Sequence, residues 1–404
     1  MQNPLPPSTE EMNRLFIKAR EYHQNGLLDA AGSSYLRLLD YFPGAPLLHF
    51  NLGLVYYEQG EYESGRNAFA RAADLSPEDM DILFNLGLTQ KKTGDVDEAI
   101  LSYKRIIEAE PTSIDALYNL AGCYKDSGQN EKAIETYLEV LQIDPAHLSA
   151  AGNLAFVYHL NGESAQAIRY YQRVLELNPD HRSAKHMLAS LSGNGTASPP
   201  ESYVKDVFDN YSPHYEKSLV IELEYCVPTT MRELVDKNSG WKNRYAHGLD
   251  LGCGTGLGGQ AFCDMVEILD GIDLSEKMIA IAAAKEIYRD LHAGNIIDSL
   301  GSTSERYDFY LAADVFAYVG ELAKTFSLLR QQARPDVLFC FSTETLNGSG
   351  YRLQQTGRFA HDPDYIKEVA GATGWKVAAS HKTLLRKEKG NWVTGDIWFL
   401  RLPD

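Results

Sequence analysis

The chain has 404 residues, enough for two ordinary domains, and a globular composition that is 44% hydrophobic, 11% aromatic and 23% charged. Its formal net charge of −17 argues against nucleic acid as a partner, because affinity for a phosphate backbone comes mainly from Lys and Arg. The same charge argues against binding to an anionic membrane surface.

The N-terminal residues and the cysteines support a cytoplasmic location. The first residues have no basic segment followed by an apolar one, and no run of about 18 apolar residues occurs, so we expect neither a signal peptide nor a membrane span. The five cysteines are scattered and follow no metal-ligand spacing, which is typical of reduced thiols without a metal site. Residues 1–11 form a tail and the start of a helix that Ser8 and Glu11 are spaced to cap.

Residues 12–181 repeat with a period of 34 residues. Glycine suits a tight turn between two helices, and proline ends the second helix of each repeat. The pattern resembles the tetratricopeptide repeat, which implies an all-α solenoid of five helix pairs with a capping helix over residues 181–191. The recurring positions are Gly26, Gly60, Gly94, Gly128 and Gly162; Pro43, Pro77, Pro111, Pro145 and Pro179; and the aromatic residues Tyr35, Phe69, Tyr103, Tyr137 and Tyr171.

A file of asparagines has the same period and lies on the first helix of four repeats: Asn51, Asn85, Asn119 and Asn153. An asparagine amide offers two donors and an acceptor, so such a file can pair with the backbone of an extended peptide. It resembles the asparagine ladder of the O-linked N-acetylglucosamine transferase. The alternative is that these side chains only support helix packing. The first repeat carries Ile17 at this position, so a ladder would begin at the second.

A polar segment rich in Gly, Ser and Pro, residues 192–202, predicts a linker between the repeats (12–191) and a second domain (203–404). In the second domain, apolar strand-like runs alternate with helical stretches, which indicates an α/β fold with a mostly parallel sheet. The last two runs are too close for a crossover helix and predict an antiparallel hairpin. The expected strands are 245–251, 265–274, 307–315, 336–344, 375–380 and 396–402.

Two glycine fingerprints overlap in the turn after the first of these strands. Residues 254–259 satisfy GxGxxG, and Asp273 follows about 20 residues later, as in dinucleotide-binding proteins. The turn is also preceded by Asp250, two residues before a GxGxG pattern. A carboxylate there would repel a pyrophosphate, whereas it suits the ammonium and sulfonium groups of S-adenosylmethionine. Asp250 therefore favours the second cofactor.

The sequences LDLGCGTG and GIDLSEKMI resemble motif I and its successor in class I S-adenosylmethionine-dependent methyltransferases, which have a Rossmann-like fold. The resemblance implies that the glycines let the backbone approach the methionine and ribose parts. The first aspartate would face the methionyl ammonium, directly or through water, and the second would bind the ribose hydroxyls. A leucine and a methionine would lie near the adenine, whose edge an Asn-Ile pair would read, with Asn in place of the commoner Asp. These positions are Asp250, Gly252, Gly254, Gly256, Asp273, Leu274, Met278, Asn295 and Ile296.

Together with the repeats, three further segments extend the resemblance over nearly the whole chain. VFDNYSPHYEKSL, AADVFAYVGEL and SGYRLQQTGRFAHDPDYI are similar to predicted bacterial methyltransferases that carry N-terminal tetratricopeptide repeats. The resemblance implies a lid over residues 203–230. HYEKSL and Cys226 depart from the family pattern within it, and both concern closure over the cofactor.

Three residues are candidates for catalysis. Methyl transfer needs alignment, plus a base where the acceptor arrives protonated. Tyr211 would cap the methionyl carboxylate or shield the sulfonium, unless it is a core aromatic residue. Asp314 lies at the end of the expected strand 307–315 and would act as base or contact the methionyl group, unless it is a structural cap. His361 has an ordinary pKa suited to a base near neutral pH, unless it is a surface residue.

Further residues and absences bear on the acceptor. Tyr318 is a weaker candidate of the same kind, and Arg358 would either hold an acceptor carboxylate or pair with Asp362. No Asn-Pro-Pro-Tyr type motif follows the expected strand 307–315 and no Pro-Cys dipeptide occurs, which argues again against nucleic acid.

The sequence thus predicts a cytoplasmic methyltransferase that uses S-adenosylmethionine and modifies an N or O atom of a protein or peptide bound by its repeats. Two alternatives stay open. One is a small-molecule methyltransferase whose repeats serve assembly, and the other is a non-catalytic adaptor that binds the cofactor.

Overall fold

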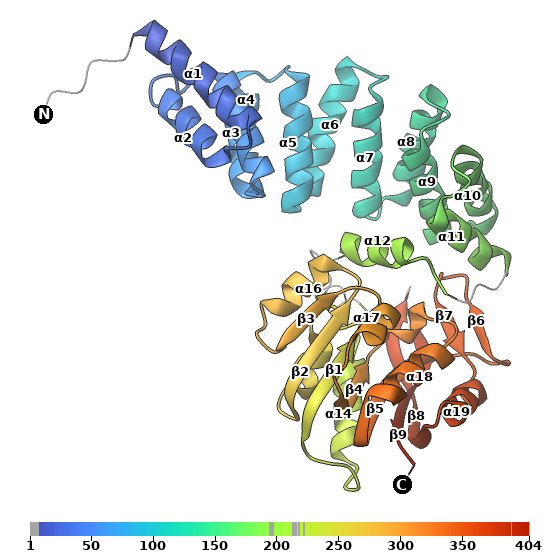
Figure 1. Cartoon of the computed structure of the whole chain (residues 1–404). Coiled ribbons are helices and arrows are strands. Elements are labelled where there is room, and N and C mark those ends of the chain that lie inside the picture. Colours follow the sequence, from blue (N-terminus) through green and yellow to red (C-terminus); the bar gives the residue numbers. More distant parts are fainter. Residues whose placement is uncertain are drawn as a thin grey trace, which may run out of the picture. The chain divides into compact units, whose positions relative to one another are not determined.

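The computed structural model describes residues 8–193, 198–211, 216, 219–220, 223–388 and 390–403. The chain divides into two compact units, Met1–Pro179 and Asp180–Asp404, each of which is described by itself (Figure 1). Within the described residues, no helix has both the length and the apolar character needed to cross a membrane.

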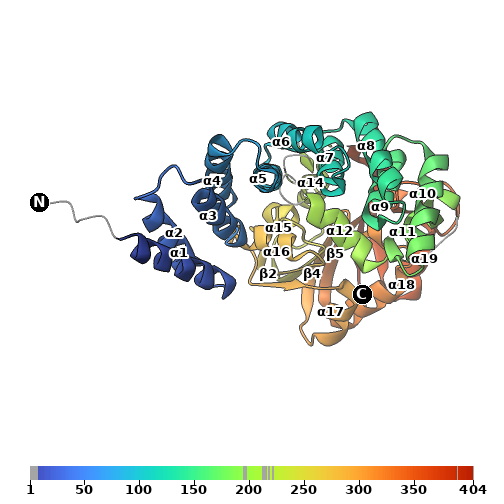
Figure 2. The same cartoon turned by 90° about the horizontal axis from the view of Figure 1, so that it is seen from above.

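The described part of the first unit is a series of helix pairs, which Figures 1 and 2 show one after another. The first helix carries the predicted capping box, in which the side chains of Ser8 and Glu11 each accept a hydrogen bond from the other residue's backbone N–H. The helices are α1 (Thr9–Gln24), α2 (Leu28–Leu39), α3 (Pro46–Glu58), α4 (Tyr62–Leu75), α5 (Met80–Thr93), α6 (Val96–Ala109), α7 (Ile114–Asp126), α8 (Asn130–Ile143), α9 (Leu148–Leu160) and α10 (Ser164–Leu177).

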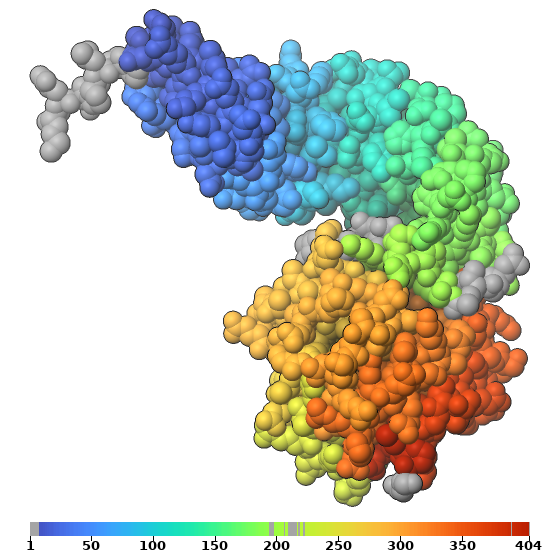
Figure 3. Space-filling model, in the orientation of Figure 1, coloured from blue at the N-terminus to red at the C-terminus, as the bar shows by residue number. Residues whose placement is uncertain are grey.

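The repeating residues explain this arrangement. Each of the five period glycines has a positive φ, between 70° and 87°, in the turn between the two helices of its pair. The aromatic side chain of the second helix fills the space above a small residue of the first: a Cβ added to Gly53 would lie 2.7 Å from the ring of Phe69. The predicted all-α solenoid is confirmed, and the space-filling view shows neighbouring repeats in close contact (Figure 3).

The four asparagines of the predicted ladder are half-buried and lie on α3, α5, α7 and α9. Asn51, Asn85 and Asn119 each donate a side-chain N–H to the carbonyl four residues earlier on the same helix, at 2.7–2.8 Å. Asn153 donates instead to the hydroxyl of Tyr118 at 3.1 Å. Each amide therefore uses one of its hydrogens within the repeats.

The helix after the fifth pair belongs to the second unit. α11 (Arg182–Ser192) coincides with the predicted capping helix, yet the compact units divide before it, between Pro179 and Asp180. Its His186 donates a ring N–H to the carbonyl of Gly357 at 3.0 Å, and its Ser190 donates to the carbonyl of Gln354 at 2.6 Å. These long-range bonds, invisible in a local repeat pattern, place the helix with the α/β fold rather than with the repeats 12–191.

In its described residues the second unit is built on one nine-stranded sheet, in which seven strands have the order β3-β2-β1-β4-β5-β7-β6 and β8 and β9 lie off this path. Neighbours from β3 to β5 are parallel, as is β5 with β7; β9 pairs antiparallel with β5, and β8 with β9. The predicted Rossmann-like fold with its C-terminal hairpin is confirmed. The strands are β1 (Tyr245–Leu251), β2 (Val266–Asp273), β3 (Asp290–Ala293), β4 (Tyr307–Ala312), β5 (Ala333–Thr345), β6 (Tyr351–Leu353), β7 (Phe359–His361), β8 (Lys376–Glu388) and β9 (Asn391–Arg401).

The strands differ from the prediction mainly where their sequences are polar. β1 has the predicted bounds, because it is a nearly continuous buried apolar run. β3 was not predicted, since it has only four residues and none is buried. The sequence predicts that the hairpin's first strand ends at 380, whereas β8 continues to Glu388 through a charged segment expected to be a connection.

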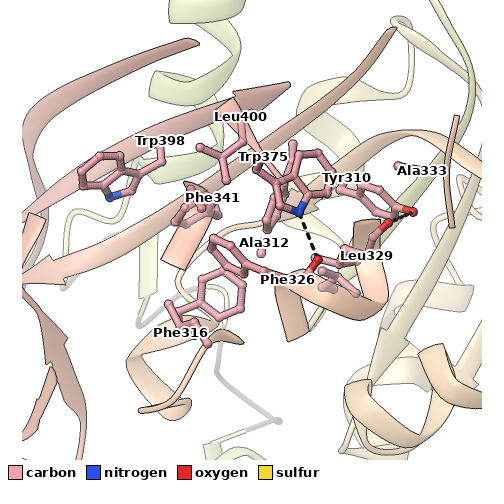
Figure 4. Close-up of a cluster of buried hydrophobic side chains, with 14 of the residues drawn as sticks. Tyr310, Ala312, Phe316, Phe326, Leu329, Ala333, Phe341, Trp375, Trp398 and Leu400 are labelled. Atoms are coloured by element: carbon pink, nitrogen blue, oxygen red, sulfur yellow. Dashed lines mark hydrogen bonds between the residues drawn. The ribbon is translucent and has the colours of Figure 1, made fainter. Parts of the chain in front are cut away.

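Helices accompany the strands, and a large aromatic core forms in this unit (Figure 4). Within the core, Trp375 donates its indole N–H to the carbonyl of Phe326 at 3.0 Å, and Tyr310 donates its hydroxyl to the carbonyl of Leu329 at 3.1 Å. The polar atoms of these large side chains are therefore satisfied. The helices are α12 (Glu201–Tyr211), α14 (Val227–Asp236), α15 (Leu257–Phe262), α16 (Glu276–Ala283), α17 (Ile296–Ser302), α18 (Ala323–Gln332) and α19 (Pro363–Ala372), with a 3₁₀ turn, η3 (Phe316–Tyr318).

The strand order reverses between β1 and β4. From β1 the chain proceeds outward to β2 and β3, whereas β4 and β5 lie on the other side of β1. In open α/β sheets, ligands bind at the carboxyl ends of the strands at such a switch point. The segments that follow Leu251 and Ala312 are therefore the place to look for a site.

Candidate functional site

The turn after β1 is held open by three glycines in the left-handed region. The φ angles of Gly252, Gly254 and Gly256 are 62°, 54° and 92°, which other residues adopt only at a cost. A Cβ on Gly252 would lie 2.7 Å from the side chain of Val315, whereas a Cβ on Gly254 would meet no atom within 4 Å. The backbone of the turn therefore faces open space at Gly254, where a ligand can approach it closely.

Asp273 lies beside this open backbone. It ends β2, and its two carboxylate oxygens accept hydrogen bonds from the backbone N–H groups of Gly254 and Ser275, each at 2.9 Å. The structure thus brings together two predicted cofactor residues that are 19 positions apart in the chain. Their contact orients the carboxylate at the carboxyl edge of the sheet, at the position predicted to bind ribose hydroxyls.

Asp250 lies deeper than the sequence predicts. It is 1% exposed, and the hydroxyl of Tyr288 donates to its carboxylate at 2.8 Å. The same hydroxyl accepts from the backbone N–H of Gly259, at the start of α15, at 3.2 Å. Burial raises the pKa of Asp250 from its ordinary 3.8 to about 7, and the hydrogen bond from Tyr288 opposes this effect. In this conformation Asp250 supports the glycine turn from beneath and does not face the open side.

The residues predicted to surround an adenine occupy different environments. Leu274 is half-buried, directly after Asp273, but Met278 is 0% exposed and is a core residue of α16. Asn295 caps α17, because its side-chain oxygen accepts from the N–H of Ile297 at 2.7 Å. Its amide nitrogen donates to Glu201 of α12 at 2.5 Å.

Ile296 begins α17 as a half-buried residue and packs against the aromatic core. Of the predicted adenine positions, Leu274 and Asn295 thus remain near the surface of the carboxyl edge. Asn295 is already linked to α12, a helix that the sequence assigns to the lid.

A second group of polar residues lies at the carboxyl ends of β4 and β5. Asp314 has a φ of 63°, and its backbone N–H donates to Ser342 of β5 at 2.8 Å. One nitrogen of Arg386, on β8, donates to both carboxylate oxygens of Asp314, at 2.7 and 2.5 Å. Arg386 also pairs with Glu344 of β5 and Glu388 of β8. Asp314 is therefore an ion-pair partner in a buried network and not a helix cap.

Arg358 joins the same network. Its Nε donates to Glu344 at 2.9 Å, and another of its nitrogens donates to Glu388. The sequence offers Asp362 as its partner, but Asp362 caps α19 (Pro363–Ala372) instead. We refer to Asp314, Glu344, Arg358, Arg386 and Glu388 as the charged cluster.

The two groups lie one on each side of the switch point, where open α/β sheets bind their ligands. Family comparisons agree with this geometry. Residues 18–79, 50–114 and 112–180 match models of the tetratricopeptide repeat, and residues 249–341 match a model of the methyltransferase domain. The chain carries tetratricopeptide repeats and a methyltransferase domain.

The relatives include one curated enzyme and several solved repeat proteins. The ubiquinone biosynthesis O-methyltransferase of Aromatoleum aromaticum is 26% identical over 150 residues, which cover 33% of this chain and 62% of that enzyme. The match therefore spans less than two thirds of that relative. The crystal structure of YrrB, a TPR protein with an unusual peptide-binding site, has 22% identity and a TM-score of 0.40, covering 43% of this chain and 89% of YrrB. A crystal structure of MamA has 22% identity and a TM-score of 0.41, covering 44% and 96%.

We refer to Asp180–Asp404 as the methyltransferase unit and to Met1–Pro179 as the repeat unit. In the methyltransferase unit, His361 is not placed to act as a base. It is 0% exposed on β7, and a ring nitrogen donates to the carbonyl of Gly320 at 3.0 Å. Burial lowers its pKa to about 4. Tyr211 is the last residue of α12, and its side chain lies outside the described residues.

The methyltransferase unit also places three residues in the site that the sequence does not single out. Tyr288 supports Asp250, Arg386 holds Asp314, and Glu201 contacts Asn295. None belongs to a motif. Arg386 and Glu201 lie 72 and 94 positions from their partners, so only the folded sheet brings them together.

Proposed function

We propose that the chain transfers a methyl group from S-adenosylmethionine to an N or O atom of a protein or peptide that its repeats hold. The observation that carries this proposal is the open backbone at Gly254 beside the carboxylate of Asp273. A carboxylate is suited to pair with the two ribose hydroxyls, and the glycine backbone leaves room for the methionyl part. S-adenosylmethionine supplies the methyl group on a sulfonium when it is bound.

The charges at this turn favour S-adenosylmethionine over a dinucleotide. Asp273 lies beside the open backbone of the turn, and its carboxylate would repel a pyrophosphate but attract an ammonium or a sulfonium, whereas the buried Asp250 adds to this preference only in its ionised form. The nearby Lys285 does not reverse this preference, because its ammonium pairs with Glu216.

The cofactor assignment is tested by calorimetric titration of the full chain with S-adenosylmethionine and with NADH. Replacing Asp273 by Ala removes the ribose contact and should weaken S-adenosylmethionine binding by about 1–3 kcal/mol, or roughly 5- to 150-fold. Glu267→Gln, at an exposed position near the start of β2, is the control and should bind as the original chain does. Binding of NADH, or equal affinities for Asp273→Ala and the control, would refute the assignment.

The repeats support a protein or peptide acceptor. Asn51, Asn85 and Asn119 recur along the first helices of successive repeats, and each has used one amide hydrogen within its own helix. The amide oxygen and the second hydrogen are the groups that would pair with an extended backbone. The asparagines are evenly spaced along the repeats, which suits the evenly spaced backbone groups of an extended peptide.

The double substitution Asn85→Ala/Asn119→Ala tests this role. It should raise the KM for a protein acceptor roughly 5- to 150-fold through the loss of two hydrogen bonds. The kcat should stay nearly unchanged, because these contacts bind the acceptor equally in the ground state and in the transition state. Asn130→Ala, on the second helix of its repeat, is the control. A KM that does not change would favour a role in helix packing.

The alternative acceptor is a small molecule, with the repeats serving assembly. The name of the similar enzyme, an O-methyltransferase of ubiquinone biosynthesis, favours this alternative. It predicts that the asparagine substitutions leave methyl transfer unchanged. A non-catalytic adaptor predicts cofactor binding without transfer to any acceptor.

A further inference from the structure

The proposed function gives no role to the carboxylates and guanidiniums of the charged cluster. It lies at the carboxyl ends of β4 and β5, next to the glycine turn, because Val315 follows Asp314 and its side chain reaches Gly252. Ligands of doubly wound sheets occupy both sides of the switch point. If the cofactor lies over the turn, the acceptor atom must therefore approach from the side of this cluster.

Both guanidinium groups of the cluster are already paired. All three nitrogens of Arg386 contact carboxylates: one contacts Asp314, one contacts Glu344, and Nε contacts Glu388 at 3.0 Å. Arg358 likewise donates to Glu344 and Glu388. An acceptor carboxylate would have to displace one of these pairs to reach a guanidinium.

The cluster carries a surplus of negative charge, since it has three carboxylates and two guanidiniums. The most exposed member of the cluster is the carboxylate of Glu388. The side chains of Glu388 and Asp314 are 26% and 19% exposed, against 18% for Arg358 and only 4% for Arg386. An incoming group therefore meets an acidic surface.

An aromatic ring lies beside the charged cluster. Tyr318, in η3, lies beside the cluster: burial raises the pKa of its hydroxyl, and the guanidiniums of Arg358, which hydrogen-bonds to it, and Arg386 oppose this. Its ring centroid lies 5.2 Å from that of Phe208 on α12, in an edge-to-face arrangement. Carboxylates combined with aromatic rings suit a cationic group.

We propose that the methyl acceptor is an amine, whose nitrogen binds against Asp314 and Glu388 beside Tyr318. This inference rests on the proposed function and narrows its acceptor from an N or O atom to a nitrogen that arrives as an ammonium ion. It applies to a lysine-type side chain and to a small amine alike.

The chemistry of transfer fits this charge. The ammonium gives a proton to the carboxylate of Asp314, whose pKa is raised by its burial although Arg386 opposes this. The nitrogen lone pair then forms the bond to the methyl carbon, while the carbon–sulfur bond breaks and its electron pair stays on sulfur. Asp314 afterwards releases the proton to water.

The sign of the charge that develops on the acceptor distinguishes an amine from a carboxylate or a hydroxyl. The nitrogen becomes positive as it takes the methyl group, and with Asp314 protonated it is the carboxylate of Glu388, the most exposed of the cluster, that lies beside that charge. A carboxylate acceptor, or a hydroxyl ionised for attack, would instead place a negative charge beside Asp314 and Glu388 while both guanidiniums are occupied.

The test identifies the atom that receives the label. The full chain is incubated with S-adenosylmethionine carrying a tritiated methyl group and with an extract of the source cells, and the labelled products are hydrolysed and compared with N-methyl and O-methyl standards. We expect alkali-stable label that elutes with an N-methylated amine. Alkali-labile label released as methanol, or label in an O-methyl ether, would overturn the amine while leaving the methyltransferase standing. Binding of S-adenosylmethionine without transfer would overturn the proposed function, and the inference with it.

A pair of substitutions adds a readout for the cluster itself. Asp314→Asn should lower kcat about 100-fold and change the affinity for S-adenosylmethionine less than threefold, because it removes the proton acceptor and keeps the shape. Glu267→Gln, at an exposed position on β2, is the control for folding and cofactor binding. Equal kcat values for the two variants would count against Asp314 as the group that faces the acceptor.

Discussion

Replacing Arg386 by Leu should destabilise the methyltransferase unit by about 3–5 kcal/mol, the usual cost of removing one partner from a buried ion pair. The substitution leaves Asp314, Glu344 and Glu388 with Arg358 as their one guanidinium in the charged cluster. For a unit of this size the midpoint of thermal unfolding should fall by roughly 6–20 °C. Differential scanning calorimetry of the full chain measures this midpoint.

The loss should depend on pH in a defined direction. Burial already raises the pKa of Asp314 and Arg386 opposes this, so without the guanidinium that pKa lies still further above its value in the unfolded chain. A raised pKa contributes stability at low pH that is lost as the pH increases, so Arg386→Leu should be more damaging at pH 8 than at pH 5. The control is Lys367→Met, which breaks an exposed pair with Asp364 and should cost less than about 0.5 kcal/mol. Similar losses for the two variants would contradict a buried network.

Replacing Asp250 by Asn should stabilise the methyltransferase unit at alkaline pH. A pKa raised from 3.8 to about 7 corresponds to roughly 4 kcal/mol, because one pH unit equals about 1.4 kcal/mol. The group's contribution is present below pH 4 and is lost as the pH rises through 7. The asparagine keeps an oxygen for the hydroxyl of Tyr288 but carries no charge to bury.

The measurement is the free energy of unfolding of the full chain between pH 4 and pH 8. The original chain should lose up to about 4 kcal/mol across this range relative to Asp250→Asn, and the difference should be smallest at pH 4. Asp298→Asn, at an exposed position of α17, should follow the original chain. A pH-independent difference would show that burial of this carboxylate does not carry the cost. Calorimetry with S-adenosylmethionine then tells whether the charge also contributes to binding.

Local sequence patterns predict much of the fold. The 34-residue period predicts the helix pairs, because each pair contacts its neighbours in the chain and the same glycine and aromatic positions recur in every contact. The apolar run 245–251 and the glycines that follow it likewise predict β1 and its turn, because only glycine accepts three positive φ angles in five residues without strain.

The candidate site is predicted only in part. Asp273 and Gly254 are named by the motif and do meet, since β1 and β2 are parallel neighbours that end at the same edge. Met278 and His361 have suitable side chains but are fully buried, and a side chain's exposure cannot be derived from its position in a motif. Arg386 lies in a charged segment that resembles a connection, and its burial follows from the pairing of β8 with β9.

The sequence by itself therefore determined the two architectures, the glycine turn and the identity of the carboxylate that lies beside it. All of these depend on contacts between near neighbours or on a motif with its own backbone geometry. The tertiary structure alone decided which charges meet: Asp250 with Tyr288, Asp314 with Arg386, and α11 with the α/β fold. The physical reason is that such partners lie far apart in the chain and become neighbours only when the strand order is fixed, while burial then sets their pKa values and with them their chemistry.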